Sequence, residues 1–492
     1  MSSHASSRMW SATSILCGMH LSCWFALAVL GCAADAQKSG QSPAPPMVGD
    51  LGEQAAGILA QAIRFRTVNP PGDEGPLAAY FATILKASGI DARVIPTPSG
   101  TSTVGRAAVW ARLPGTGTRP PIVLLSHLDV VPASRSDGWD VDPFAGSVAG
   151  GKVIGRGALD AKGLAVVHLL TLTELARRQT RLARDVVFLA TPDEENGGLD
   201  GAGWLVRAHP QLLLGAEYLL TEGGGINVDP AGGPEAWQVA VSEKSPCWLR
   251  VATQGRPGHS SVPDDDAAVP RLLATLEPIR RRQSPLRVVP EVARMFRALA
   301  PLAPAEDASG FANLTDALAF DDAFRTRFLS EPAYAALVRD TLAITMLEGG
   351  PRTNVVPAEA SAHLDARLLP GGRCEDFAVE IAALAAPSGA EVQILLAFAS
   401  VSSPVDTPLY RAIATVARRR DPGAVMVPRV LAGFTDAHFF REHGITAYGF
   451  VPRWQRRGEH RGIHGPNEQI TVKNLRKGVE TLVAILEELD RS

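Results

Sequence analysis

A histidine and an aspartate lie two residues apart directly after a short apolar run. His127 and Asp129 follow the apolar residues 122–125. Residues two apart point the same way on an extended strand, so His127 could ligate a metal while Asp129 orients its ring. The same spacing recurs at His363 and Asp365, where it indicates the polar face of a strand. One such pair therefore leaves a metal ligand and an ordinary satisfied histidine equally open.

Acidic residues occupy two further places where a metal or a proton could be handled. Asp160 lies in a glycine-rich stretch before a predicted helix. It could either cap that helix or ligate a metal. Asp193, Glu194 and Glu195 follow the apolar run at 186–190. Adjacent acids are costly unless they are solvated or paired with cations. One of them could hold a metal while its neighbour moves a proton, and we expect Asp193 to be a solvated turn residue.

Glu222 and His464 complete the set of candidate ligands. Glu222 follows a predicted strand in a glycine loop, and His464 precedes the last predicted helix. Each alone is more often structural. Taken together, four of the candidate sites fall at carboxyl ends of predicted strands, where open α/β sheets place their active sites. Two histidines and several carboxylates suit a hydrolytic zinc site, and a carboxylate shared between ions fits a co-catalytic pair.

The elements that must position these residues alternate between strand and helix. This alternation predicts an α/β catalytic domain with a mainly parallel sheet, formed by residues 49–242 and 371–492. We expect residues 243–370 to form a separate inserted α+β domain. Within it, residues 287–345 are rich in Ala, Leu and Phe with Pro breaks, which predicts a mostly helical insertion.

Composition and the N-terminal residues limit the function classes. The 492 residues carry a formal net charge of -3, without the basic footprint of a nucleic-acid-binding surface. Residues 1–36 have a basic start, a short apolar core and small residues, which indicate a signal peptide, and 37–48 are typical of a linker. A cleaved soluble form, a lipid anchor at Cys32 and an uncleaved anchor remain open. Each exports the protein, to the periplasm or beyond.

Two cysteines lie outside the export segment, Cys247 and Cys374. Neither belongs to a Cys/His cluster, so we do not expect them to ligate metal. They could pair in an oxidising compartment, but two cysteines in a large domain are more often free and buried.

The combined motifs resemble the M20 family of metallopeptidases, which includes aminoacylase, carboxypeptidase G2 and carboxypeptidase S. The resemblance covers about residues 50–490, in order. The matching stretches are SHLDVVP (126–132), GRGALDAKG (155–163), TPDEENGG (191–198), TEGG (221–224), GRPGHSS (255–261), NVVP (354–357), GFTDA (433–437) and HGPNE (464–468). The insertion at 287–345 is most similar to carboxypeptidase S and the secreted N-acyl amino acid hydrolases.

The resemblance implies a role for each matching position. It assigns His127 and Glu222 to one metal ion, Glu195 and His464 to a second, and Asp160 to both. It makes Asp129 the support of His127 and Glu194 the general base. It places His259, Asn354 and Arg367 in a lid domain, where His259 would stabilise an oxyanion, often across a homodimer, and the other two would contact substrate. It places Gly433 in the lining of the substrate pocket.

Two positions depart from the family pattern. Ala161 stands where relatives often carry a polar residue, a change we expect to be tolerated because position 161 has no ligand role. Phe434 replaces the second glycine of a Gly-Gly-Thr-Asp stretch and is expected to narrow the pocket or shift specificity.

The sequence thus predicts a two-zinc hydrolase that cleaves the amide of a small N-acyl amino acid or dipeptide. Co²⁺ or Mn²⁺ would also suit the ligand set. Two alternatives are kept: a two-zinc aminopeptidase, which needs a free substrate amine, and a catalytically silent binding protein.

Overall fold

The computed structural model describes residues 49–491 apart from 101, 103, 230 and 457–461. The expected signal peptide, the linker and the anchor at Cys32 lie outside these residues. Within the described part of the chain, no helix combines the length and apolarity needed to cross a membrane.

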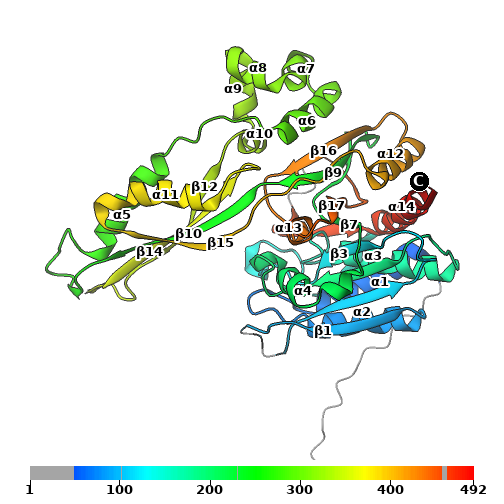
Figure 1. Cartoon of the computed structure of the whole chain (residues 1–492). Coiled ribbons are helices and arrows are strands. Elements are labelled where there is room, and N and C mark those ends of the chain that lie inside the picture. The colour runs from blue at the N-terminus through cyan, green and yellow to red at the C-terminus, as the bar shows by residue number, and fades with distance from the viewer. Residues whose placement is uncertain (1–48, 101, 103, 230, 457–461, 492) are drawn as a thin grey trace, which may run out of the picture. The chain divides into compact units, whose positions relative to one another are not determined.

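A ten-stranded sheet forms the centre of the larger part of the described chain (Figure 1). Four neighbouring strands at its centre run parallel: β6 (Val186–Thr191), β3 (Ile122–His127), β7 (Tyr218–Thr221) and β17 (Thr446–Gly449). Every residue of β3 and β6 is buried, as expected for strands covered on both faces. The antiparallel strands β1 (Asp91–Pro96) and β2 (Ala107–Leu113) extend one side. The other side is formed by β9 (Pro234–Glu243), β8 (Gly225–Val228), β18 (Trp454–Arg456) and β16 (Val425–Leu431).

Helices cover both faces of this sheet. One face packs against α1 (Leu51–Arg64), α2 (Gly75–Ala87), α3 (Lys162–Arg177), α12 (Pro408–Arg420) and α14 (Val472–Arg491). The other face packs against α4 (Ala202–Ala208) and α13 (Ala437–Glu442). In α14, Leu475, Val479, Leu482 and Leu486 recur at helical spacing and are buried, which is why this helix lies flat on the core.

A separate four-stranded antiparallel sheet forms the inserted part. Its strands are β12 (Thr341–Glu348), β14 (Glu359–Leu368), β10 (Ser245–Gln254) and β15 (Glu391–Ala397), in that spatial order. One face packs against α5 (Ala268–Arg281) and α11 (Cys374–Ala385). The alternating residues Ala362, Leu364 and Ala366 of β14 are buried under these helices, as their spacing predicted.

Two small sheets complete the strand inventory of the described residues. A two-stranded antiparallel sheet pairs β11 (Gly258–His259) with β13 (Val355–Val356). The other sheet joins β4 (Ser147–Ala149), β5 (Lys152–Ile154) and β19 (Gln469–Thr471), and so connects the C-terminal part of the chain to the segment before Asp160.

The helical insertion forms its own core on the larger sheet. Its helices are α6 (Pro290–Leu299), α7 (Ala305–Ala312), α8 (Leu314–Phe320), α9 (Asp322–Ser330) and α10 (Pro332–Leu337). Phe296 makes ring contacts with Phe311, Phe328 and Tyr334 at 4.9–5.2 Å between centroids. This aromatic cluster continues into Val427 and Val430 of β16. Although the insertion was assigned to the lid by sequence, its apolar face is therefore buried against the ten-stranded sheet.

The chain leaves the inserted part later than predicted. We expected the return at residue 371, but α11 and β15 also belong there, because β15 pairs with β10 from Cys247 to Ala252. The disulfide between Cys247 and Cys374 also corrects the preferred interpretation of free thiols. Because α11 packs over β10, the Cα atoms of the two cysteines lie 5.2 Å apart, although 127 positions separate them in the sequence.

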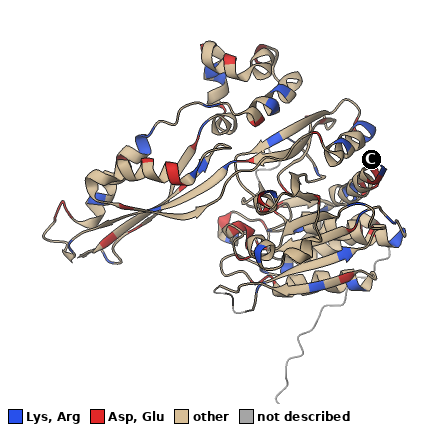
Figure 2. Cartoon of the chain, in the orientation of Figure 1, with Lys and Arg blue, Asp and Glu red and all other residues tan. Residues whose placement is uncertain are grey.

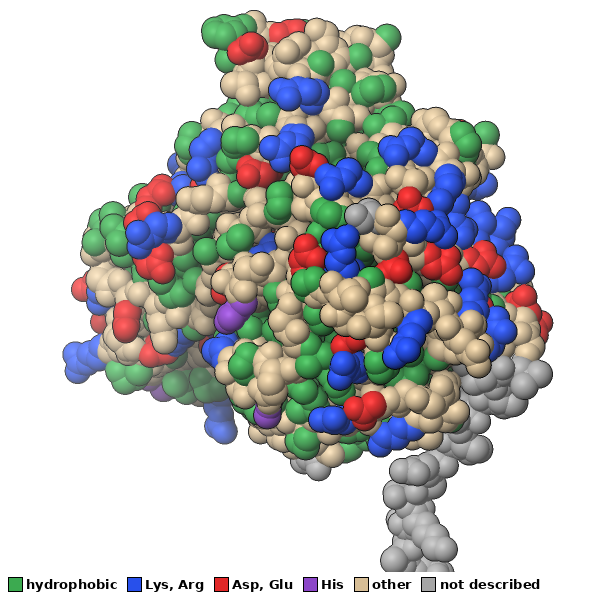
Figure 3. Space-filling model, turned by 45° about the vertical axis from the view of Figure 1, so that its right-hand side comes forward, with side chains coloured by type: hydrophobic (Ala, Val, Ile, Leu, Met, Phe, Trp, Pro, Cys, Tyr) green, Lys and Arg blue, Asp and Glu red, His purple; other side chains and the backbone are tan. Residues whose placement is uncertain are grey.

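Acidic and basic side chains are interspersed over the chain rather than segregated (Figure 2). The face drawn in Figure 3 likewise mixes Lys and Arg with Asp and Glu among apolar side chains.

Candidate metal centre

Two groups of His and acidic side chains meet at the carboxyl ends of the central parallel strands. One contains His127, Asp160 and Glu222, and the other contains Asp160, Glu195 and His464. In each group the candidate ligand atoms lie within 4.8 Å of one another. His127 ends β3, and Glu222 directly follows β7. The structure therefore brings together the five residues that the sequence predicted as metal ligands.

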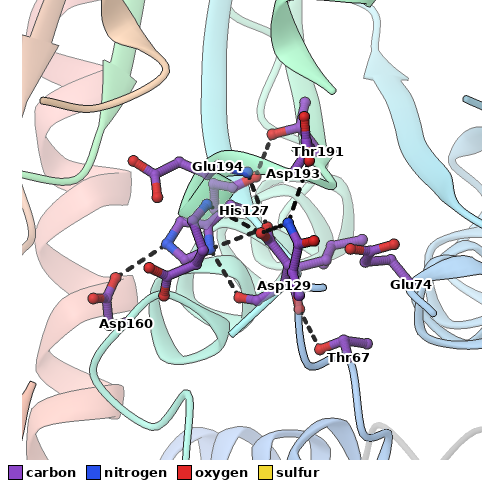
Figure 4. A network of polar contacts seen from close by, with 12 residues as sticks. Thr67, Glu74, His127, Asp129, Asp160, Thr191, Asp193 and Glu194 are labelled. Carbon is purple, nitrogen blue, oxygen red and sulfur yellow. Dashed lines mark hydrogen bonds and ion pairs between the residues drawn. The ribbon is translucent and has the colours of Figure 1, made fainter. Parts of the chain in front are cut away.

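Asp160 is common to both groups and faces both histidines. Its Oδ1 lies 3.0 Å from Nε2 of His127, and its Oδ2 lies 3.1 Å from Nε2 of His464. Figure 4 shows Asp160 and His127 pointing toward each other. A carboxylate whose two oxygens face two different sites is suited to bridge two ions.

The remaining acids each approach one histidine. Glu222 Oε2 lies 3.6 Å from His127 Nε2, and Glu195 Oε2 lies 3.2 Å from His464 Nε2. The other oxygen of Glu195 is buried and has no hydrogen-bond partner among the described residues. An orphaned buried carboxylate oxygen beside histidine nitrogens fits a metal ion, and the N and O donors suit zinc.

The electrostatics of the centre also fit a cation. Burial raises the pKa of Glu222 to about 7, since charge on this acid is costly without a compensating ion. Burial raises the pKa of Glu195 as well. Hydrogen bonds to Asp160 and Glu195 raise the pKa of His464 to about 10. Bound cations would let these groups act as carboxylates and a neutral imidazole, the forms that ligate metal.

Asp129 holds two parts of the centre at once. Its main-chain oxygen lies 3.0 Å from Nδ1 of His127, nearer than its carboxylate Oδ1 at 3.5 Å. The carboxylate accepts hydrogen bonds from the backbone amides of Glu194, at 3.2 Å, and Glu195, at 3.1 Å. Asp129 therefore approaches His127 most closely through its main chain, while its carboxylate fixes the turn that carries Glu194 and Glu195.

The interpretation of Asp193 as a solvated turn residue is wrong. It is 2% exposed, and Arg106 Nη1 donates to its Oδ1 at 2.9 Å. Arg106 also donates to both oxygens of Glu74, each at 3.1 Å. Asn69 Nδ2 links the network to the metal centre by donating to Asp129 at 2.9 Å and to Asp193 at 3.3 Å. The sequence left solvation or a cation open for these acids, and nothing near them in the chain indicated Arg106.

Glu194 lies beside the ligands without belonging to either group (Figure 4). It is buried, and burial followed by the negative charge of Glu222 raises its pKa well above the ordinary value. A carboxyl group with a raised pKa suits proton transfer near neutral pH. Asp436, from the loop that begins at Gly433, accepts a hydrogen bond from Thr191 at 2.9 Å on the adjoining strand end.

The sequence places the chain in a known family. Residues 123–488 match the model of peptidase family M20/M25/M40. The chain belongs to this family. It is therefore a metallopeptidase or amidohydrolase of M20 type, with the fold that the sequence predicted.

Individual relatives agree with this assignment. Human aminoacylase-1 is 28% identical over 402 residues, which cover 80% of this chain and 86% of that protein. The N-fatty-acyl-amino acid synthase/hydrolase PM20D1.1 of Danio rerio is 28% identical over 362 residues, or 72% of this chain and 69% of that protein. The M20 metallo-carboxypeptidase Sso-CP2 of Sulfolobus solfataricus shares the fold, with a TM-score of 0.68 at 20% identity over 89% of this chain and 99% of that one.

The four predicted substrate-contacting positions of this M20 enzyme lie outside the metal cluster. His259 is exposed in β11, where its Nδ1 accepts from the backbone amide of Ser261 at 3.1 Å. Asn354 is exposed and directly precedes β13, the strand that pairs with β11. Arg367 forms two hydrogen bonds with Asp365, at 2.7 and 2.9 Å. Gly433 is exposed, with no atom within 4 Å of where a Cβ would stand.

Proposed function

We propose that this M20 enzyme hydrolyses the amide bond of small N-acyl amino acids or dipeptides that carry a free carboxylate. The observation that carries the proposal is the shared Asp160 between two ligand groups, with the buried Glu194 beside them. The aminoacylase and N-fatty-acyl-amino acid hydrolase relatives support an N-acyl amino acid over a free-amine peptide.

Each side chain of the centre has a defined task in this reaction. His127 and Glu222 would hold one zinc ion, Glu195 and His464 a second, and Asp160 both. When bound, the pair would supply the Lewis acidity that lowers the pKa of a water molecule toward neutrality. Glu194 accepts a proton from the water as the water oxygen adds to the amide carbon, and returns it to the amine nitrogen as the C–N bond breaks. The products are a carboxylic acid and a free amino acid.

The inserted part would anchor the substrate. Asp365 already engages Nε and Nη2 of Arg367, so a substrate carboxylate would meet Nη1. Asn354 would contact the substrate beside it, and Gly433 would line the pocket. His259 would stabilise the oxyanion after the lid closes, either from the same chain or from the partner in a homodimer formed through the lid.

Phe434 would give the anchor an apolar neighbour. The guanidinium carbon of Arg367 lies 4.7 Å from the centre of the Phe434 ring. Phe434 also contacts the rings of Phe398 and Trp248, at 5.2 and 6.1 Å. A glycine at this position, as in the family pattern, would leave that space open. The aromatic contacts favour a substrate with an apolar group next to its carboxylate.

Replacing Glu194 tests the mechanism. In Glu194→Gln, kcat for an N-acyl amino acid should fall about 10²–10⁴-fold, because the amide cannot take the proton, while zinc content stays near two per chain. Glu174→Gln serves as the control, because the Glu174 carboxylate pairs with Arg177 and Arg178 at the C-terminal end of α3 and not with the metal centre. Near-normal turnover of the metal-loaded Glu194→Gln enzyme would contradict the assigned base.

A substrate panel separates the proposal from the aminopeptidase alternative. The wild-type enzyme should cleave N-acyl amino acids. It should not cleave peptides that have a free amino terminus and an amidated carboxyl terminus. The reverse preference would favour a two-zinc aminopeptidase.

We also propose that the enzyme is exported, on the strength of residues 1–36 alone. Cell fractionation of the full chain and of a Cys32→Ser variant tests both export and lipid anchoring, since only loss of an anchor moves the variant into the soluble fraction.

A further inference from the structure

Glu468 is a buried carboxylate that connects two segments of the metal centre. It is 0% exposed and lies four residues after His464. The resemblance that assigned ligands, base and lid residues gave Glu468 no role, although it ends the HGPNE stretch.

Among the described residues, four hydrogen bonds reach the Glu468 side chain, and all come from the loop that carries Asp160. Oε1 accepts from the backbone amides of Leu159, at 2.6 Å, and Asp160, at 3.1 Å. Oε2 accepts from the backbone amide of Gly157, at 3.1 Å, and from Nη1 of Arg156, at 2.7 Å. The Glu468 carboxylate thus holds the backbone of the loop that contains Asp160, although the two residues are 308 positions apart in the chain.

The main chain around Glu468 strengthens this connection. Its carbonyl accepts from the amide of Gly155 at 2.9 Å, and the following strand β19 pairs with β5. Asn467 Oδ1 accepts from the amide of Asp140 at 3.0 Å. These contacts anchor the C-terminal side of the segment that presents His464.

We propose that Glu468 is a positioning residue that holds the loop of Asp160 against the segment of His464 and so sets the second metal site. Two of the three ligands of that site, Asp160 and His464, depend on this carboxylate. In the site of His127 and Glu222, only the shared Asp160 depends on it. The inference rests on the metal centre of the proposed function, but it can be tested by zinc binding without any substrate.

Glu468→Gln is the sharpest variant because it keeps shape and removes acceptors. Each carboxylate oxygen accepts from two donors, whereas an amide offers one oxygen and one NH₂ group. Whichever way the amide turns, its NH₂ group faces two donors, and two of the four hydrogen bonds are lost. The charge that pairs with Arg156, at 2.7 Å, is lost as well.

The measurement is titration of the metal-free full-length enzyme with Zn²⁺ in competition with a chromogenic chelator. The wild type should take up two equivalents, and Glu468→Gln should bind the second about 10–100-fold more weakly, the usual effect of losing a group that orients ligands. The kcat/KM of the variant should recover as zinc is raised. A smaller folded fraction would also respond to zinc, because zinc stabilises the folded state. Circular dichroism of the metal-free variant therefore measures its folded fraction before the titration, and this fraction should equal that of the wild type.

Asp185→Asn is the matched control. Asp185 is also buried, and its oxygens accept from Arg112 Nε at 2.7 Å and from the amide of Gly115 at 2.8 Å. It lies at the amino end of β6, whereas the metal centre lies at the carboxyl end of the same strand. Asp185→Asn should bind two equivalents as the wild type does.

Unchanged affinity for both zinc equivalents in Glu468→Gln would overturn the proposal, even if the variant melted at a lower temperature. If Glu468→Gln does not fold, Arg156→Gln decides, because it removes one of the four donors and leaves the carboxylate. It should weaken the second equivalent in the same direction by a smaller factor, and unchanged affinity there would overturn the proposal equally.

Discussion

Arg106 illustrates how single residues determine whether the acids of the centre can be buried together. Asp193, Glu74 and Asp129 are all buried, and Arg106 contacts Asp193 and Glu74 directly. A buried charge that loses its partner is strongly destabilising, which makes Arg106 more important to folding than its place outside any motif suggests.

Arg106→Met should lower the free energy of unfolding by about 3–5 kcal/mol, since Glu74 and Asp193 are left without their cation. Urea denaturation of the metal-free protein measures the change. Arg93→Met is the control: Arg93 is exposed over the ring of Trp110, so its replacement should change stability little. If the two substitutions lowered the free energy of unfolding equally, the buried ion pairs of Arg106 would contribute no more to stability than an exposed ion pair.

Helix α3 shows how an element can carry a titratable group without using it in the site. His168 lies on its buried face, and neither ring nitrogen has a hydrogen-bond partner among the described residues. Burial lowers the pKa of His168 to about 3, from an ordinary value of 6.5. The folded protein therefore holds this ring neutral at pH values where the unfolded chain protonates it.

The linkage gives a pH dependence with a definite sign. Because the folded pKa is lower than the unfolded one, stability is lost as pH falls below 6.5, and the loss continues to about 3. At about 1.4 kcal/mol per pH unit, wild type should lose roughly 2 kcal/mol more than His168→Leu between pH 7 and pH 5. Denaturant midpoints at both pH values measure this. Parallel losses in the two proteins would contradict a neutral buried His168.

At the scale of the whole molecule, the metal centre joins segments from distant parts of the chain. One ligand ends β3, two follow β6 and β7, one precedes α3, and one comes from the segment before β19. Any ligand that binds only the folded state stabilises it, so bound ions should contribute to global stability.

Removing metal with a chelator should lower the melting temperature, and adding back Zn²⁺, Co²⁺ or Mn²⁺ should restore it. The stabilisation is about 2.7 kcal/mol per site at an ion concentration 100 times the Kd. Asp160→Asn, which lacks the bridging carboxylate, should melt at a temperature that responds much less to the chelator. A wild-type melting temperature unaffected by chelator would contradict a metal bound across these segments.

Much of the fold and of the candidate site could be predicted from local patterns. Apolar runs before His127 and Glu195 predicted parallel strands with candidate metal ligands at their ends, and both runs are strands. His363 and Asp365, which have the same spacing, lie on β14, and Asp365 pairs with Arg367. Such patterns are readable because strand direction and burial leave their trace within a few neighbouring residues.

What the sequence by itself determined is the set of ligand types, their order and the sheet edge that presents them. Only the tertiary structure decided which residues hydrogen-bond to the ligands and to the acids beside them. The partners of Asp193 and Asp160 lie 87 and 308 positions away in Arg106 and Glu468. The pairing of Cys247 with Cys374 and the packing of the helical insertion on β16 were decided in the same way. Contacts over such separations depend on how whole elements pack, and local spacing carries no record of that packing.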